Sequence, residues 1–352
     1  MPDTKLDGVH HFTGVTADVT ANVDFWCRIL GLRFVKKTLN FETTFRYHTY
    51  YGDEEGRPGS IVTFLEFNEL ERQRPGAGNI QRIVLRVGSY DAVDFWLRRL
   101  AEHQVHSEML RLDATQPTRL IFEDFEGHEI ELAVSDAPDE PQLADADDIP
   151  VEFRIRGVEG ARSYTTAEEL LPFAEHLGFR PEGDHLVLNG ESRSSRWYFT
   201  TPPERPFQEL ATGVWHHIAF DAGCDLKSWR EHANAGPVPF TQVFDHYIFD
   251  SCYAVSPGGL VELCSYGPGF TLDQKLEDLG EGAVSLSPWT EPLRARLESE
   301  LTPIHNPRSR KKAGRFARGK HEAANGVPSE SAREPTVAVG QSRQPVHRDE
   351  VS

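Results

Sequence analysis

The sequence has 352 residues, a length that suggests two domains rather than one. Hydrophobic residues make up 38% of it and aromatic residues 10%, which is enough for real cores. No apolar run approaches the roughly 20 residues of a membrane-spanning helix, and the N-terminus has no signal-peptide pattern. The net charge of −18 argues against nucleic acid as a partner, because phosphate backbones require a basic surface. We therefore expect a cytoplasmic protein that binds neither membranes nor nucleic acid.

The first predicted elements have the order β-α-β-β-β. Residues 8–16 are typical of a strand. Residues 18–30 carry apolar side chains at helical spacing and end before Gly31, a natural helix stop. Three strand-like runs follow near residues 32–39, 45–52 and 60–67.

The same order then recurs over the next part of the chain. Residues 79–87 predict a strand and residues 89–103 a helix, and strands are predicted near 105–112, 117–124 and 128–134. The two predicted helices share Val-Asp-Phe-Trp, at residues 23–26 and 93–96. Chance is the alternative, but a match at the same place in the same order of elements indicates an internal repeat.

Two weaker repeats follow an acidic, proline-containing segment at residues 136–150, which is typical of a linker. The third repeat starts with a predicted strand at residues 151–155 and continues with a helix over 166–177 and strands near 179–181, 185–189 and 195–200. The fourth starts at Gly213, with a helix near 225–235 and strands near 239–244, 247–255 and 260–266. Residues 306–352 have almost nothing to bury, which predicts disorder.

Two histidine pairs lie inside apolar strand-like runs, His10-His11 near the N-terminus and His216-His217 at the start of the fourth repeat. A buried strand normally excludes a side chain that titrates near neutral pH. Core histidines bonded to backbone carbonyls are the ordinary alternative, but two pairs in matching contexts favour a shared metal. Since side chains alternate along a strand, each pair supplies one candidate ligand and one neighbour.

A third ligand is available in the last predicted strand of the fourth repeat. Glu262 is a lone carboxylate among apolar residues, where an unpaired charge would be costly unless it faces solvent on the outer side of the sheet. Two imidazoles and one carboxylate form the facial arrangement of Fe(II) and Mn(II) enzymes. Glu131 occupies the equivalent place in the second repeat, so it is the fallback carboxylate, with His128 as the fallback imidazole.

Several stretches together carry a resemblance to a known family. They are Gly8–Thr13, Val23–Trp26 followed by Leu30–Phe41, Tyr47–Asp53, Pro58–Phe64, Gly213–Phe220 and Ser251–Gly259. In these stretches and in the repeated β-α-β-β-β order, the chain resembles the vicinal oxygen chelate superfamily of glyoxalases, bleomycin resistance proteins and extradiol dioxygenases. Over residues 6–290 it looks most like ring-cleaving dioxygenases of the hydroquinone type.

The resemblance implies an α+β fold of four β-α-β-β-β modules that pair into two half-open barrel domains, with a disordered C-terminal tail. The domains would span residues 6–135 and 151–300, joined by the linker at 136–150 and followed by the tail at 306–352. A homo-oligomer is left open.

The resemblance also implies an enzyme of aromatic compound catabolism. This ring-cleaving dioxygenase would use O2 to open a dihydroxy-aromatic of the hydroquinone or catechol class. Its Fe(II) or Mn(II) would bind both the aromatic substrate and O2. The residues carried over as metal ligands are His11, His217 and Glu262. The residues carried over to the pocket are His10, Thr13, His216 and Tyr253, among which His10 or His216 would act as acid-base, while Tyr253 and His246 steady the reacting substrate.

The chain departs from the family pattern at two places. His246 stands where such enzymes usually have arginine, which changes a permanent cation into a titratable donor. The turn before Glu262, at Gly258-Gly259, is one residue short. We place the deletion in the turn and keep Glu262 as a ligand.

Two other functions fit the same scaffold. A glyoxalase-like isomerase or thiol-dependent transferase would prefer two carboxylates or a fuller ligand set. A non-enzymatic protein that binds small molecules would need no stoichiometric metal. The four cysteines form no CxxC pair, and Cys252 and Cys264 are expected to be buried free thiols.

Overall fold

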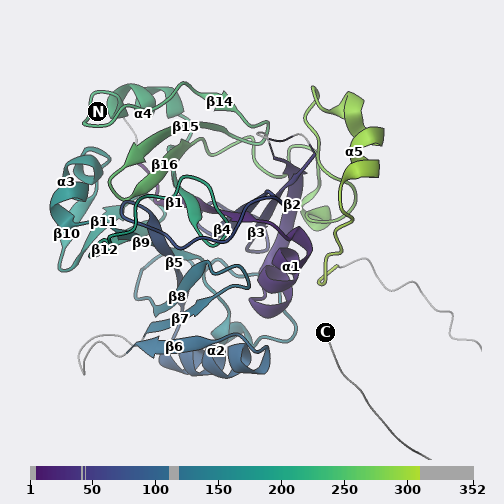
Figure 1. Ribbon diagram of the computed structural model, residues 1–352, viewed down its shortest axis with the longest axis horizontal. Coiled ribbons are helices and arrows are strands. Elements are labelled where there is room, and N and C mark those ends of the chain that lie inside the picture. The colour runs from purple at the N-terminus through teal and green to yellow at the C-terminus, as the bar shows by residue number, and fades with distance from the viewer. Residues whose placement is uncertain (1–4, 41–42, 44, 111–118, 310–352) are drawn as a thin grey trace, which may run out of the picture. The chain divides into compact units, whose positions relative to one another are not determined.

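The computed structural model describes residues 5–40, 43, 45–110 and 119–309. The mixture of strands and helices in this part confirms the predicted α+β class (Figure 1). These residues belong to one compact unit, Met1–Ser309. The predicted disordered tail, 306–352, lies outside the described residues from residue 310 onward.

The first module begins with a strand that is buried along its whole length. Its elements are β1 (Val9–Thr16), α1 (Val19–Val23), the π-helical η1 (Asp24–Ile29), β2 (Arg33–Leu39), β3 (Tyr47–Gly52) and β4 (Ile61–Glu66). Asp18 caps α1 by accepting hydrogen bonds from the N–H groups of Thr20 and Ala21. The single helix predicted over 18–30 therefore changes type at Asp24, because apolar spacing does not distinguish an α-helical turn from a wider π-helical one.

The second module repeats the order of the first. Its elements are β5 (Ile80–Val87), α2 (Tyr90–Glu102), β6 (Ser107–Leu110), β7 (Arg119–Glu123) and β8 (Glu129–Val134). Trp26 and Trp96, which end the shared tetrapeptide, are both fully buried. The repeated sequence thus marks the same packing position in two modules. The predicted strand ends at 111–112 and 117–118 lie outside the described residues.

The third and fourth modules follow the same β-α-β-β-β order. The third contains η2 (Val151–Phe153), β9 (Val158–Tyr164), α3 (Ala167–His176), β10 (Arg180–Glu182), β11 (His185–Asn189) and β12 (Ser194–Thr200). The fourth contains β13 (Trp215–Asp221), α4 (Leu226–Ala233), β14 (Phe244–Asp245), β15 (Asp250–Ser256) and β16 (Gly259–Cys264). After β16 come η3 (Leu276–Asp278), η4 (Glu291–Leu293) and α5 (Arg294–Glu300).

Two strand predictions in this half are wrong. Residues 151–153 form a 3-10 helix, and the first strand of the third module begins only at Val158. The strand predicted over 239–244 is reduced to the two-residue β14, whose only ladder partner in the described part is β15. Both segments have strand-like composition but lack a neighbouring strand over most of their length, and pairing rather than composition makes a strand.

The first strands of the four modules lie side by side in the order β9-β5-β13-β1, at the centre of a sheet that has 16 strands in the described part of the chain. β1 pairs antiparallel with β13, and β5 pairs antiparallel with β9. Strand pairing therefore joins the first module to the fourth and the second to the third. The domain boundaries expected from the sequence, and the closure into half-open barrels, stay predictions.

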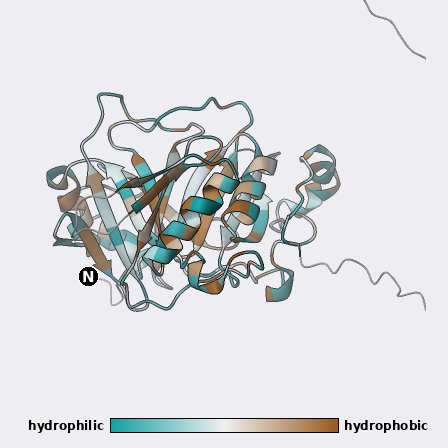
Figure 2. Cartoon of the chain, turned by 90° about the horizontal axis from the view of Figure 1, so that it is seen from below, coloured by the Kyte–Doolittle hydropathy of each residue, from teal (hydrophilic) through white to brown (hydrophobic). Residues whose placement is uncertain are grey.

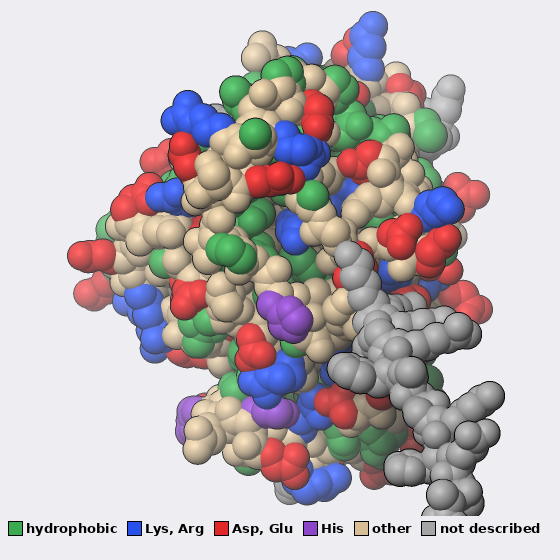
Figure 3. All heavy atoms as spheres, turned by 90° about the vertical axis from the view of Figure 1, so that its right-hand side faces the viewer, with side chains coloured by type: hydrophobic (Ala, Val, Ile, Leu, Met, Phe, Trp, Pro, Cys, Tyr) green, Lys and Arg blue, Asp and Glu red, His purple; other side chains and the backbone are tan. Residues whose placement is uncertain are grey.

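Hydrophobic strands and amphipathic helices build the core (Figure 2). One large cluster of buried side chains runs through all four modules, and it includes Trp26, Trp96, Trp197 and Trp215. The segment 136–150 forms no helix or strand, but it is packed against the fold, since Ala146 and Ile149 are each only 1% exposed. Acidic and basic side chains are interspersed on the face shown in Figure 3.

The segment after β16 returns to the first module. Lys36 of β2 is 1% exposed, and its Nζ donates to the carbonyl of Phe270 at 2.8 Å and to Oδ1 of Asp273 at 2.6 Å. The N–H of Ser285 donates to the carbonyl of Lys37 at 2.9 Å. These contacts hold residues 270–290 beside β2 and so add a wall on that side of the fold. None of the helices in the described ranges is both long and apolar enough to cross a membrane.

Candidate metal centre

Three side chains from the first and fourth modules converge at the paired strands β1 and β13. Nε2 of His11 lies 3.3 Å from Nε2 of His217. Oε2 of Glu262 lies 3.4 Å from Nε2 of His11 and 2.8 Å from Nε2 of His217. His11, His217 and Glu262 are at most 3% exposed. The structure thus brings together the three residues that the sequence analysis named as ligands, from positions some two hundred residues apart.

This donor set fits a divalent metal. A metal bonded at about 2.1 Å to neighbouring ligands of an octahedron holds them roughly 3.0 Å apart, close to the spacing of the three atoms. Two neutral imidazoles and one carboxylate also match the ligand preference of Fe(II) and Mn(II). Although burial opposes ionisation, the imidazoles of His11 and His217 hold the pKa of Glu262 well below its usual value. The carboxylate is therefore ready to bind a cation.

The other histidine of each pair, His10 or His216, lies at an irregularity of the β1–β13 ladder. Val9 pairs with Phe220 and His11 with Ala219, so His10 is the extra residue on β1. On the other strand, Thr13 pairs with His217 and Gly14 with Trp215, so His216 is the extra residue on β13. Such β-bulges occur beside active sites, where they re-aim a side chain.

The two bulges turn the extra histidines toward the candidate ligands. Nδ1 of His10 lies 2.9 Å from Nδ1 of His11, and Nδ1 of His216 lies 2.7 Å from Nδ1 of His217. Regular alternation along a strand would turn His10 away from the face of His11, and the bulge is the physical reason why the two rings are in contact. His11 and His217 thus each have a hydrogen-bond partner at Nδ1, the ring nitrogen that does not face the other candidate ligands.

Both partner histidines are held in the neutral form. Burial, reinforced by the neighbouring imidazole of His11, lowers the pKa of His10 well below its usual value. Burial and His217 lower the pKa of His216 to about 3. A neutral ring accepts the Nδ1–H of its neighbour and thereby fixes the tautomer that leaves Nε2 free for a metal.

Glu262 is positioned by the β15–β16 hairpin. Ser256 pairs with Gly259 across a two-residue turn, and Tyr253 pairs with Glu262 further along. The short turn noted in the sequence therefore does not displace the carboxylate. Ser251 of β15 donates its hydroxyl proton to Oε1 of Glu262, which leaves Oε2 for the two imidazoles. Ser251 is fully buried, so this hydrogen bond is shielded from water.

The first module carries a threonine where the fourth carries its carboxylate. Glu262 pairs with Ala219, two residues beyond His217, and Thr63 pairs with Thr13, two residues beyond His11. Thr63 Oγ1 lies 2.8 Å from Thr13 Oγ1 and 2.8 Å from Nε2 of His48. The predicted pocket residue Thr13 is therefore part of a hydrogen-bonded network, and the site has one carboxylate rather than two.

Tyr253 and His246 form a hydrogen-bonded pair next to His217. The phenol of Tyr253 lies 3.0 Å from Nε2 of His246, and its ring is 5.7 Å from that of His217. Burial lowers the pKa of His246, so this side chain is a neutral hydrogen-bonding group and not a cation. It lies in the β14–β15 turn, where Tyr247 adopts a φ of 73° and the N–H of His246 donates to the carbonyl of Phe249 at 3.0 Å.

A cavity of about 300 Å³ lies beside His246. His48 and Tyr50 line it from β3, and His246 lines it from the β14–β15 turn. Trp289 and Thr290 line it from the segment after β16. The phenol of Tyr50 lies 2.8 Å from Nδ1 of His48. His48 and Tyr50 were not identified as site residues from the sequence. Their one available signal was alternation along a strand, which puts both on one face of β3.

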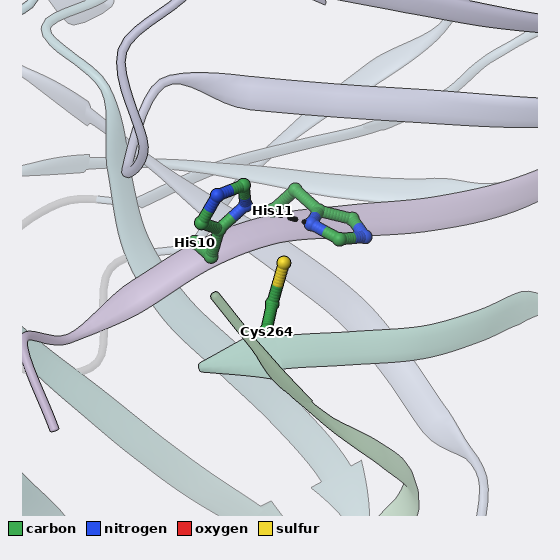
Figure 4. Close-up of side chains that lie close together, drawn as sticks. All are labelled: His10, His11 and Cys264. Carbon is green, nitrogen blue, oxygen red and sulfur yellow. Dashed lines mark hydrogen bonds between the residues drawn. The ribbon is translucent and has the colours of Figure 1, made fainter. Parts of the chain in front are cut away.

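Cys264 also approaches the histidines from β16 (Figure 4). Its Sγ lies within 4.8 Å of ring nitrogens of His10 and His11, so this trio is a second possible group of ligands. Burial and Glu262 raise the pKa of Cys264 well above its usual value, which keeps the thiol protonated. A protonated thiol is a poor metal ligand, so we favour the carboxylate set. As expected, Cys252 and Cys264 are buried free thiols.

The fallback ligands lie elsewhere. His128 bonds Asp124 through Nδ1 at 2.9 Å and belongs with Asp124 and Glu126 to a separate buried group. Glu131 receives hydrogen bonds from Arg119 at 2.8 Å and from Arg162 at 3.1 Å, so guanidinium groups occupy its oxygens. Neither residue is near His11 or His217 in the described clusters.

Comparisons with known proteins bear on this geometry. Residues 8–132 match the model of the glyoxalase/bleomycin resistance protein/dioxygenase superfamily. MhqA of Bacillus subtilis (strain 168), provisionally named a ring-cleaving dioxygenase, is 30% identical over 322 residues, which cover 85% of this chain and 99% of MhqA. The chain belongs to the glyoxalase/bleomycin resistance protein/dioxygenase superfamily.

Other members of the superfamily support the dioxygenase branch. The chlorohydroquinone/hydroquinone 1,2-dioxygenase of Sphingobium indicum is 27% identical over 312 residues, covering 83% of this chain and 95% of that protein. The crystal structure of a provisionally assigned dioxygenase from Bacillus subtilis has a TM-score of 0.77 and 27% identity, covering 86% of this chain and 99% of that chain. The chain is accordingly an oxygenase-type enzyme of this superfamily.

Proposed function

We propose that the chain is a metal-dependent dioxygenase that opens the ring of a dihydroxy-aromatic of the hydroquinone class. The observation that carries the proposal is the convergence of His11, His217 and Glu262, a face of two imidazoles and one carboxylate on which Fe(II) or Mn(II) fits. Relatives that carry ring-cleaving names, one of them named for hydroquinone, support the substrate class.

A bound divalent metal would supply Lewis-acid and redox chemistry between a substrate hydroxyl and O2. The chain's own contribution is to hold the three ligands in fixed orientations. His10 and His216 orient the two imidazoles through Nδ1, and Ser251 orients the carboxylate through Oε1. This division of roles differs from the sequence-based hypothesis, which made His10 or His216 the acid-base residue. Since the rings of His10 and His216 are hydrogen-bonded to His11 and His217, we propose that they position these two ligands.

The proton-handling groups of the proposed reaction line the cavity or border it. Nε2 of His246 and the hydroxyl of Tyr253 lie 3.0 Å apart and can pass a proton between them when one of them contacts a substrate hydroxyl. His48 and Tyr50, which also line the cavity, offer a second hydrogen-bonded pair. A neutral His246 in place of the family's arginine favours a substrate that needs a hydrogen bond at this point rather than a permanent counter-charge.

The ligand set argues against the glyoxalase-like alternative. An isomerase of that kind would use a second carboxylate, and the register position equivalent to Glu262 is filled by Thr63. The buried, ionised Glu262 argues against a binding protein without metal, because a carboxylate at 1% exposure is costly without a cation beside it.

The test is oxygen uptake by protein prepared without oxygen and loaded with Fe(II) or Mn(II). We expect uptake with hydroquinone or catechol that depends on the metal and yields a ring-opened product. Apo protein and the Glu262→Gln variant are the controls, and both should be inactive. Protein that binds one metal ion per chain but consumes no oxygen with either substrate would refute the proposal.

A further inference from the structure

The second and third modules pair in the same way as the first and fourth, and they contain a charged cavity at their own shared strands. Its volume is about 740 Å³, within the range of small-molecule sites. Arg82 on β5, Arg119 on β7 and Arg162 on β9 line it, together with Tyr198 on β12. We call these four residues the arginine cage. The strands that carry them are labelled in Figure 1.

The cage occupies the register position of the metal centre in the other pair of modules. Glu131 pairs with Val84, two residues beyond Arg82, as Glu262 pairs with Ala219, two residues beyond His217. The carboxylate is therefore kept, and a guanidinium stands where the other site has an imidazole. Cationic side chains fill the place that a metal would take.

Positive charge is in excess around this carboxylate. Arg119 Nη1 lies 2.8 Å from Glu131, Arg162 Nε lies 3.1 Å from it, and Arg82 Nη1 lies 3.8 Å from it. Arg82 has one further acidic partner, Glu129, at 3.2 Å. Three guanidinium groups thus face two carboxylates. Each guanidinium has five N–H donors, many more than two carboxylates can accept.

Several buried nitrogens of the cavity lining have no hydrogen-bond partner among the described residues. They are Nε of Arg82, Nε of Arg119 and Nε2 of His185. Buried polar atoms are normally satisfied, so these three nitrogens show that the protein's own acceptors do not use all the donors of Arg82, Arg119 and His185. Elsewhere in the lining, Arg196 pairs with Glu159 and Asp136, and Asp184 pairs with His185.

The cage is held rigid and has an apolar wall. The guanidinium carbons of Arg119 and Arg162 lie 4.9 Å and 4.8 Å from the ring centroid of Tyr198, over its ring. Stacked guanidinium groups are preorganised for planar, bidentate recognition of a carboxylate. Leu110 and Val134 add apolar lining.

We propose that the arginine cage binds a small organic carboxylate, whose charged end meets Arg82, Arg119 and Arg162 and whose apolar body lies against Leu110 and Val134. This site is separate from the metal centre, and the proposal does not depend on the reaction catalysed there.

Calorimetric titration of the full-length protein with benzoate tests the proposal. The His217→Ala background removes binding of the probe to a metal at the other site. We expect one benzoate per chain, at least tenfold weaker binding after Arg162→Gln, and no binding of benzamide, the neutral analogue. Arg98→Gln, which removes an exposed arginine from α2, is the matched charge control and should bind benzoate as before.

Glu131→Gln keeps the proposal testable if Arg162→Gln does not fold. It removes the internal carboxylate that competes with the ligand, so benzoate should bind several-fold more tightly. A purely structural cluster predicts no such gain. Benzoate affinity that is unchanged by both substitutions, or no binding at all, would overturn the proposal. Tighter binding of inorganic phosphate than of benzoate would overturn the assignment to an organic carboxylate.

Discussion

The role assigned to His10 makes a quantitative prediction. Its Nδ1 lies 2.9 Å from Nδ1 of His11, and the side chain is 3% exposed. In a His10→Phe variant, no water can replace the lost partner, so a buried ring nitrogen of His11 stays unsatisfied at a cost of about 1–3 kcal/mol. Loss of such a partner typically lowers metal affinity about 10- to 100-fold, which corresponds to roughly 1.4–2.7 kcal/mol.

The assay is a competition titration with a chelator, followed by oxygen uptake at saturating metal. We expect weaker metal binding and activity that largely returns when metal is in excess. His10→Gln, whose side-chain carbonyl can accept a hydrogen bond, should restore most of the affinity. The same change at His216 should cost less, because that residue is less completely buried than His10. Normal metal affinity with a collapsed kcat in His10→Phe would show instead that His10 transfers a proton.

Three further predictions concern neighbouring residues. Ser251→Ala removes the hydrogen bond to Oε1 of Glu262 and should weaken metal binding about 10-fold in the same competition titration; unchanged affinity would contradict that role. Thr63→Glu places a second carboxylate at the register position of Glu262, so it should tighten metal binding but abolish oxygen uptake; retained uptake would contradict the importance of a single carboxylate. Burial, then His11, lowers the pKa of His48 well below its usual value. The unfolded chain therefore binds a proton that the folded chain excludes, and stability falls as pH drops below about 6.5. In urea unfolding of metal-free protein, His48→Asn should reduce the slope of this loss by up to about 1.4 kcal/mol per pH unit, and an unchanged slope would contradict a buried, neutral His48.

Much of the candidate site could be predicted from the sequence because its residues stand out against their surroundings. Histidines and a glutamate inside apolar strands are exceptions to ordinary burial, and the repeat pattern puts His11, His217 and Glu262 in comparable places. Alternation along regular strands allows one ligand from each histidine pair, and the family resemblance then selects His11 and His217. The same rule failed for His10, because a bulge depends on how two distant strands pair, and neither strand encodes the irregularity alone.

The pairing of modules was beyond sequence reasoning for a related reason. Four similar modules have four similar edges, and periodicity does not say which edges meet. The contacts that decide it include β1 with β13, and they lie about two hundred residues apart. The returning segment was missed because its helices are short: α5 has only 7 residues, too few for a clear apolar stripe.

The central claim is that His11, His217 and Glu262 hold one metal ion. Its most direct test is the metal content of purified, metal-loaded chains measured by elemental analysis. We predict one ion per chain in the wild type and in a His128→Asn control, whose histidine belongs to the separate buried group, and little metal in Glu262→Gln and His217→Ala. Full metal content in Glu262→Gln, with loss in His128→Asn, would contradict the account.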